Sequence, residues 1–93
     1  ALKGLTQMTV ERPEAPLAVV VGGVLSGEVS AGTALCFLIV READGSEREC
    51  HVVPSQRPNP NGLHTVSVDL GGRTAVRLIP LGAEGVEGPA QDL

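Results

Sequence analysis

Short runs of apolar and β-branched residues, separated by glycine, proline or asparagine, recur along almost the whole chain of 93 residues. Runs of this kind are typical of β-strands joined by tight turns. No window of eleven or more residues carries the i, i+3, i+4, i+7 apolar stripe of an amphipathic helix. The sequence therefore predicts an all-β protein, with strands at Met8–Val10, Leu17–Val21, Val24–Leu25, Ala34–Val40, His51–Val53, Thr65–Leu70 and Thr74–Leu81.

The chain length allows one small domain, and the even spacing of the predicted strands fits either a closed barrel or a two-sheet sandwich. Phe37 is the only aromatic residue, whereas immunoglobulin-like sandwich cores usually contain a tryptophan or tyrosine. We therefore expect a small closed antiparallel β-barrel over residues 1–81, with an immunoglobulin-like β-sandwich as the alternative. Residues 82–93 are rich in glycine and acidic residues, and we expect them to form a flexible C-terminal tail.

Composition narrows the classes of function. With 7 basic and 11 acidic residues the net charge is −4, so the surface as a whole does not attract phosphate. The longest uncharged run, Ala15–Gly27, is too short to cross a membrane as a helix. Two cysteines are too few for a disulfide-rich secreted scaffold. We expect a cytoplasmic protein without membrane contact, in which any contact with nucleic acid is local.

The two cysteines lie at the ends of the stretch Cys36–Cys50, which we predict to be a hairpin. Its turn is a three-residue loop closed by Gly45 in the left-handed conformation. In that register Cys36 faces Val52 and Leu38 faces Cys50, so the cysteines are diagonal neighbours on one face, about 7–8 Å apart. A disulfide prefers a shorter separation, so this register disfavours one, and a two-residue turn at Asp44-Gly45 would disfavour it further by placing the cysteines on opposite faces. We therefore predict two reduced thiols that pack as small core side chains.

No residue pattern points to catalysis. The glycines of Gly22–Gly27 are followed by Glu28, not by the Lys-Ser/Thr pair of a phosphate-binding loop. The nucleophile pattern G-x-S-x-G is absent from the sequence. Among the potential zinc ligands only one pair is close in sequence, and adjacent strand residues point to opposite faces. We expect no enzyme, no cofactor and no metal; the rejected zinc ligands are Cys36, Cys50, His51 and His64.

The arginines differ in their surroundings. Arg41 and Arg48 lie among acidic residues of the same predicted hairpin, where we expect cross-strand ion pairs. Arg57 lies in the long proline-rich loop Pro54–Gly62 without an acidic neighbour. Arg57 is therefore the arginine with the most freedom to contact a partner.

A glycine pattern in the first half of the chain resembles one protein family. In Val19–Leu35 an apolar strand is followed by glycine and small apolar residues at fixed spacing, namely Gly22, Val24, Gly27, Val29, Gly32 and Leu35. This pattern resembles the opening of the second domain of translation GTPases such as elongation factor Tu, which is a β-barrel of similar length. Towards the other end, Gly71–Leu78 resembles a late strand of that barrel, and Gly88 falls near a late glycine of the family.

The resemblance implies a non-catalytic domain that docks on the nucleotide-binding domain of a parent GTPase. It also implies contact with the ribosome or with the 3′ end of tRNA, and we expect the isolated domain to be a cytoplasmic monomer. Carried over to this sequence, the resemblance gives Gln56 and Arg57 as the RNA-facing edge. The alternative fold, an immunoglobulin- or filamin-like sandwich, implies instead a protein–protein interaction or spacer module.

Overall fold

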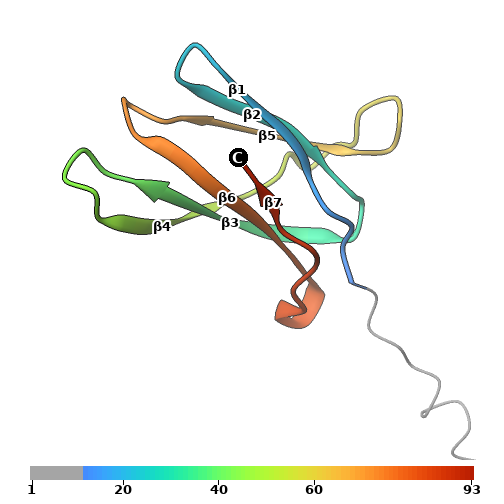
Figure 1. The fold of residues 1–93 in the computed structure, drawn as a ribbon. Coiled ribbons are helices and arrows are strands. Elements are labelled where there is room, and N and C mark those ends of the chain that lie inside the picture. The colour runs from blue at the N-terminus through green and yellow to red at the C-terminus, as the bar shows by residue number, and fades with distance from the viewer. Residues whose placement is uncertain (1–11) are drawn as a thin grey trace, which may run out of the picture.

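The structure, a computed structural model, describes residues 12–93 (Figure 1). This part of the chain forms the strands β1 Leu17–Val21, β2 Val24–Val29, β3 Thr33–Arg41, β4 Glu47–Val52, β5 His64–Asp69, β6 Thr74–Gly82 and β7 Gln91–Asp92, with one 3-10 turn at Ala83–Gly85. The strands make two antiparallel sheets, with the orders β1-β2-β5 and β4-β3-β6-β7. Figure 1 shows the two sheets lying one over the other.

One hydrophobic core joins the two sheets. Alternate residues of each strand point inward, and Leu25 of β2, Leu38 of β3 and Leu78 of β6 have no exposed surface. Phe37 is half-buried and lies next to Leu38 in β3, so it faces away from this core. The buried cluster consists of Ala18, Leu25, Val29, Cys36, Leu38, Val40, Val52, Val66, Leu70, Ala75 and Leu78.

The all-β, antiparallel class expected from the sequence is confirmed, but neither sheet closes into a barrel. In a closed barrel the first and last strands share a ladder of hydrogen bonds. Within residues 12–93, β1 pairs with β2 and β7 pairs with β6. A single side chain, that of Gln91, spans the gap from β7 to Ala18 in β1. The described residues therefore form two separate sheets and not the single closed barrel that was expected.

The hairpin of β3 and β4 has the predicted register. Cys36 pairs with Val52 and Leu38 pairs with Cys50. The turn between the strands has Gly45 at φ 87°, in the left-handed region that a three-residue loop requires. Both cysteines are free thiols, Cys36 buried in the core and Cys50 half-buried against it.

Residues 82–93, expected to form a flexible tail, instead lie along β6. In β7, Gln91 pairs with Leu78 and Asp92 pairs with Arg77. The backbone N–H of Gly88 donates to the carbonyl oxygen of Pro80 at 2.9 Å. Backbone hydrogen bonds hold this segment in place. Its glycine-rich sequence has no alternating apolar residues, and therefore a strand could not be predicted from it. The folded body extends past residue 81.

Two strands are longer than their apolar runs predicted. β2 continues to Val29 through polar residues, and β4 begins at Glu47 instead of His51. Both strands place polar side chains on a solvent-facing surface, where a strand needs no apolar residue. The predicted strand Met8–Val10 lies outside the described residues. In residues 12–93 no helix has the length and apolar character needed to cross a membrane.

Candidate functional site

The outer face of the three-stranded sheet carries a row of exposed apolar side chains on β1. Leu17, Val19 and Val21 are exposed by 69%, 62% and 73%, whereas Ala18 between them is buried in the core. Strand alternation turns these three side chains outward, and within residues 12–93 no layer covers this outer face. Because β1 lies at the edge of its sheet, Val20 on the inward side is also 44% exposed. A contiguous group of exposed apolar side chains is typical of an interaction surface. We call these three residues the β1 apolar row.

A shallow hollow of about 570 Å³ lies beside the β1 apolar row. Glu28 is the one charged residue in its lining, and the carboxylate of Glu28 accepts a hydrogen bond from the side-chain amide of Asn59. A Cβ atom at Gly27 would lie 2.7 Å from the Cβ of Ala18, so glycine permits β1 and β2 to approach closely here. The lining residues are Leu17, Ala18, Val19, Ser26, Gly27, Glu28, Thr65 and Gln91.

The carboxamide of Gln91 binds the free edge of β1. Its Oε1 accepts from the backbone N–H of Ala18 at 2.7 Å, and its Nε2 donates to the carbonyl oxygen of Ala18 at 2.8 Å. A carboxamide offers one acceptor and a donor in the same plane, as a peptide group does. The backbone of Gln91 is fixed by its pairing with Leu78 in β6. Gln91 thus takes the place that a neighbouring strand would occupy.

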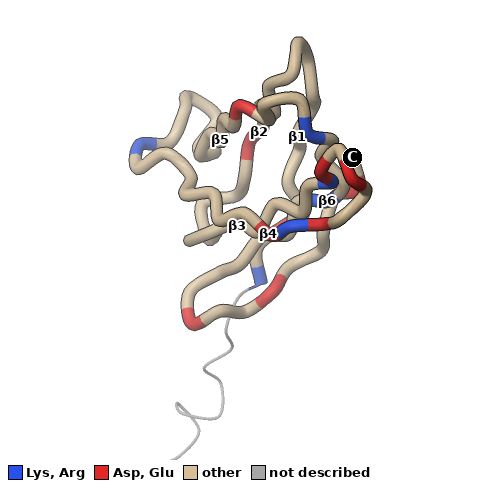
Figure 2. The backbone as a smooth tube through the Cα atoms, turned by 90° about the vertical axis from the view of Figure 1, so that its left-hand side faces the viewer, with Lys and Arg blue, Asp and Glu red and all other residues tan. Residues whose placement is uncertain are grey.

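The opposite edge of the molecule, at β4, is charged. Figure 2 shows acidic and basic residues in succession along this strand. Glu47 forms an ion pair with Arg41 at 3.1 Å, as the cross-strand register predicted, and Glu49 lies 3.6 Å from His51. These side chains are about half exposed or more, so each pair contributes little to stability, roughly 0–1 kcal/mol.

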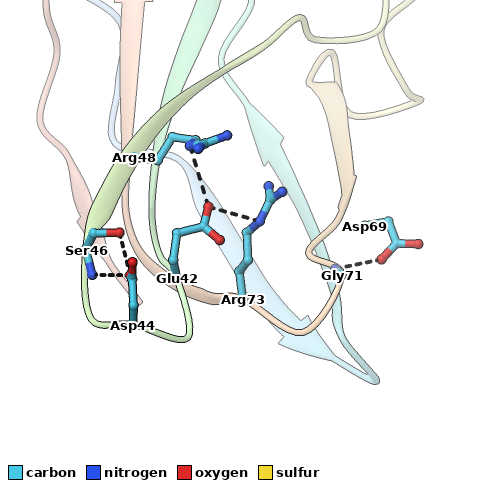
Figure 3. A network of polar contacts seen from close by, with 7 residues as sticks. All are labelled: Glu42, Asp44, Ser46, Arg48, Asp69, Gly71 and Arg73. Atoms are coloured by element: carbon cyan, nitrogen blue, oxygen red, sulfur yellow. Dashed lines mark hydrogen bonds and ion pairs between the residues drawn. The ribbon is translucent and has the colours of Figure 1, made fainter.

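Glu42 connects the β3–β4 turn to the turn between β5 and β6 (Figure 3). Its Oε1 atom lies 3.2 Å from Nε of Arg73 and 3.6 Å from Nε of Arg48. This oxygen is buried, and neither contact has the alignment of a hydrogen bond. The charges of two arginines therefore compensate one buried carboxylate oxygen, which ties the turn within the four-stranded sheet to the connection between the two sheets.

The β3–β4 turn is closed by Asp44, as Figure 3 also shows. Oδ1 of Asp44 accepts from the hydroxyl of Ser46 at 2.6 Å and from the backbone N–H of Ser46 at 2.9 Å. These hydrogen bonds, together with the positive charge of Arg48, lower the pKa of Asp44 below its usual value. The turn is therefore held by a carboxylate in its charged form.

The structure places Gln56 and Arg57, predicted as an RNA-facing edge, side by side and exposed in the loop between β4 and β5. Arg57 makes no ion pair within residues 12–93, whereas the arginines in β3, β4 and β6 and in the β5–β6 turn each make one. Asn59 orders this loop, because its Oδ1 accepts from the backbone N–H groups of Asn61 and Leu63. The loop therefore presents Arg57 on a defined backbone.

The rejected zinc ligands do not come together. Burial raises the pKa of the Cys36 thiol to about 11, so it remains protonated at neutral pH. His51 stacks on Phe37 with 4.8 Å between ring centroids, and Nδ1 of His64 lies 2.6 Å from the carbonyl oxygen of Ser55. Among residues 12–93, no group of three or more His, Cys, Asp or Glu side chains is arranged to hold a metal ion.

Sequence reasoning missed both the β1 apolar row and Gln91. It predicted the strand Leu17–Val21 but could not tell that nothing in residues 12–93 covers the outer face of this strand, and it assigned Gln91 to a tail. Comparison with known protein families, with curated proteins and with solved structures finds no match to this chain.

Proposed function

We propose that this chain is a non-catalytic immunoglobulin-like β-sandwich that acts as a protein–protein interaction or spacer module. Two sheets of three and four antiparallel strands that share one core support this fold assignment. The observation that carries the function is the β1 apolar row beside the hollow, since exposed apolar groups of this kind are typical of protein docking surfaces. The partner is a protein with an apolar, weakly charged surface.

The histidine and cysteine side chains that could carry out acid–base or nucleophilic chemistry are engaged in contacts that stabilise the fold. His64 is hydrogen-bonded to the loop backbone, and His51 stacks on Phe37. Cys36, the buried thiol, lies in the core with a raised pKa, which makes it a poor nucleophile. These contacts support a binding role over a catalytic one.

The test introduces a photoreactive amino acid at Val19 and, as a matched control, at Glu47 on the outer face of the other sheet. The captured protein is then purified and its affinity is measured for wild type and for Val19→Lys. We expect a discrete adduct from Val19 alone, and binding weakened about tenfold or more by Val19→Lys, because a charge replaces an apolar contact. Equal capture at both positions, or unchanged affinity of Val19→Lys, contradicts the proposal.

A second candidate function is the one implied by the translation GTPases, with the adjacent GTPase domain and tRNA or ribosomal RNA as partners. The exposed Arg57, without an ion pair in the described part of the chain, favours a local RNA contact that includes Gln56. The separation of the two sheets weighs against the closed barrel of that family.

RNA titration distinguishes the two candidates. If the RNA-facing edge is at Gln56 and Arg57, Arg57→Ala weakens tRNA binding several-fold and reduces its salt dependence. Arg77→Ala, which removes an arginine already paired with Asp92, is the matched control and leaves binding unchanged. Absence of tRNA binding by the wild type removes this candidate.

A further inference from the structure

Within residues 12–93 no strand pairs with the outer edge of β1, and this edge has the properties of a strand-pairing site. The N–H and C=O of Ala18 point away from β2, as their hydrogen bonds to the Gln91 side chain show. Strand alternation gives the backbone groups of Val20 the same direction. Unpaired backbone groups along a sheet edge form a template on which another strand can add.

The sequence of β1 suits pairing with an identical strand. Leu17–Val21 reads LAVVV, with no charge, no proline and a majority of β-branched residues. Uncharged, β-branched segments of this kind pair with copies of themselves when their edge is accessible. The only charged neighbour across the ladder is Glu28, opposite Leu17, and its carboxylate is bound by Asn59. Two copies with a net charge of −4 each can therefore meet along β1 without bringing charges of this strand together.

A two-fold axis through Val19 gives a register that satisfies the edge. Val19 of one copy then faces Val19 of the other, and Ala18 of each faces Val20 of the other. Both members of these outer pairs direct their N–H and C=O across the interface, as hydrogen-bonded pairs of an antiparallel ladder do. The contact is isologous, so it closes at a dimer and does not propagate into a fibre.

In the single copy this edge is closed by Gln91. Its carboxamide occupies the N–H and C=O of Ala18, which the two-fold register would need. β7 is held by its two ladder pairs with β6 and by the hydrogen bond from the Leu93 N–H to the Val76 carbonyl oxygen. The strand is only two residues long, and its ion pair between Arg77 and Asp92 at 2.9 Å is solvent-exposed. Exposed pairs of this kind contribute little, so β7 is among the elements most easily released.

We propose that the β1 edge is a self-association site for a second copy of this chain, and that the Gln91 carboxamide is the contact that keeps it closed. Release of Gln91 converts a three-stranded sheet into half of a continuous six-stranded one. This site is the strand edge, which adjoins the outer-face docking surface and shares Ala18 and Gln91 with the lining of its hollow. The proposal does not depend on a partner for that face.

The test compares Gln91→Ala with the wild type and with Gln56→Ala, which removes an exposed loop carboxamide as the matched control. Sedimentation equilibrium is measured up to millimolar concentration, and backbone NMR spectra verify the fold. We expect Gln91→Ala to dimerise at least tenfold more tightly than the wild type and Gln56→Ala to match the wild type. A folded Gln91→Ala that associates no more than the wild type overturns the proposal.

Two further variants decide the site of association. Val20→Pro in the Gln91→Ala background removes an edge N–H that β2 does not use, so the sheet is retained and the dimer is lost. A dimer that survives Val20→Pro forms elsewhere and overturns the proposal.

If Gln91→Ala does not fold, Gln91→Glu replaces it, because it keeps the acceptor for the Ala18 N–H and loses the donor to the Ala18 carbonyl. Gln91→Glu is expected to dimerise at neutral pH, and a folded monomer overturns the proposal.

Discussion

The strands β1 and β4 occupy equivalent positions, each at the outer edge of its sheet, but they are protected in different ways. β4 carries Glu47, Arg48 and Glu49, so an added strand would have to desolvate charges along its first half. β1 carries no charge and is covered by the carboxamide of Gln91 at Ala18. The first protection is part of the strand itself, whereas the second is a contact that can open.

The difference also concerns where each protection is encoded. The charges of β4 lie in the strand that they protect, so the protection of this edge can be predicted from the local sequence. Gln91 lies 73 residues from Ala18, so the protection of β1 exists only when both sheets are folded and packed. An edge of this second kind depends on the stability of the whole domain.

The comparison requires that both edges belong to one cooperative unit, and core truncation tests this with the largest expected effect. Leu25 of the three-stranded sheet and Leu38 of the four-stranded sheet are both fully buried. Leu25→Ala and Leu38→Ala should each lower the free energy of unfolding by roughly 2–5 kcal/mol. Denaturant unfolding should show one transition for both, with Ser67→Ala, at an exposed position, as the control near zero. Separate transitions for the two sheets would contradict the single unit.

Gly27→Ala acts on the β1 side alone. A Cβ there would lie 2.7 Å from both the Ala18 Cβ and the Leu17 carbonyl oxygen, so β1 must move away from β2. We expect a loss of about 1–3 kcal/mol in the free energy of unfolding, with faster hydrogen exchange of the Ala18 amide. Gly32→Ala, where a Cβ would meet nothing within 4 Å, is the control and should be close to neutral. Equal effects of both substitutions would exclude the close approach as the cause.

Glu42→Gln acts on the β4 side. It removes the charge that Arg48 and Arg73 share, at a side chain only 25% exposed. We expect a loss of about 1 kcal/mol at low salt, which shrinks at about 1 M salt as the charges are screened. Glu47→Gln breaks the exposed pair with Arg41 and should have a smaller effect on urea unfolding. A loss from Glu42→Gln that does not change with salt would indicate packing and not charge.

Asp44 gives the smallest effect, which is present near neutral pH and disappears in acid. Its pKa is lower in the folded state, through hydrogen bonds from Ser46, than in the unfolded chain. Its contribution to stability is therefore present above about pH 4 and is lost as the pH falls through the lower folded value. Asp44→Ala should flatten this part of the stability–pH curve in thermal unfolding, while Glu87→Ala, an exposed carboxylate, should not. A curve unchanged by Asp44→Ala would mean that the turn hydrogen bonds add nothing.

The sequence predicted the β3–β4 hairpin down to its register because a local rule sets it: Gly45 fixes the turn, and period-two alternation fixes the rest. The division into two sheets was not predictable in this way, since a barrel and a sandwich share the same strands and differ in which edges meet. β7 was missed because its two residues are polar and carry no apolar pattern, and the Gln91 contact because its partner Ala18 lies at the far end of the chain. The exposed loop position of Gln56 and Arg57 agrees with the sequence, while their proposed contact with RNA stays a prediction.

The bond between Gln91 and Ala18 has a consequence for the order of events in folding. A contact across 73 residues is non-local, so we expect it to form only after both sheets have formed. During that interval the β1 edge is open in every molecule, whatever its final state. The rate at which the last strand arrives, set against protein concentration, therefore determines how many chains mature alone and how many meet a second copy first.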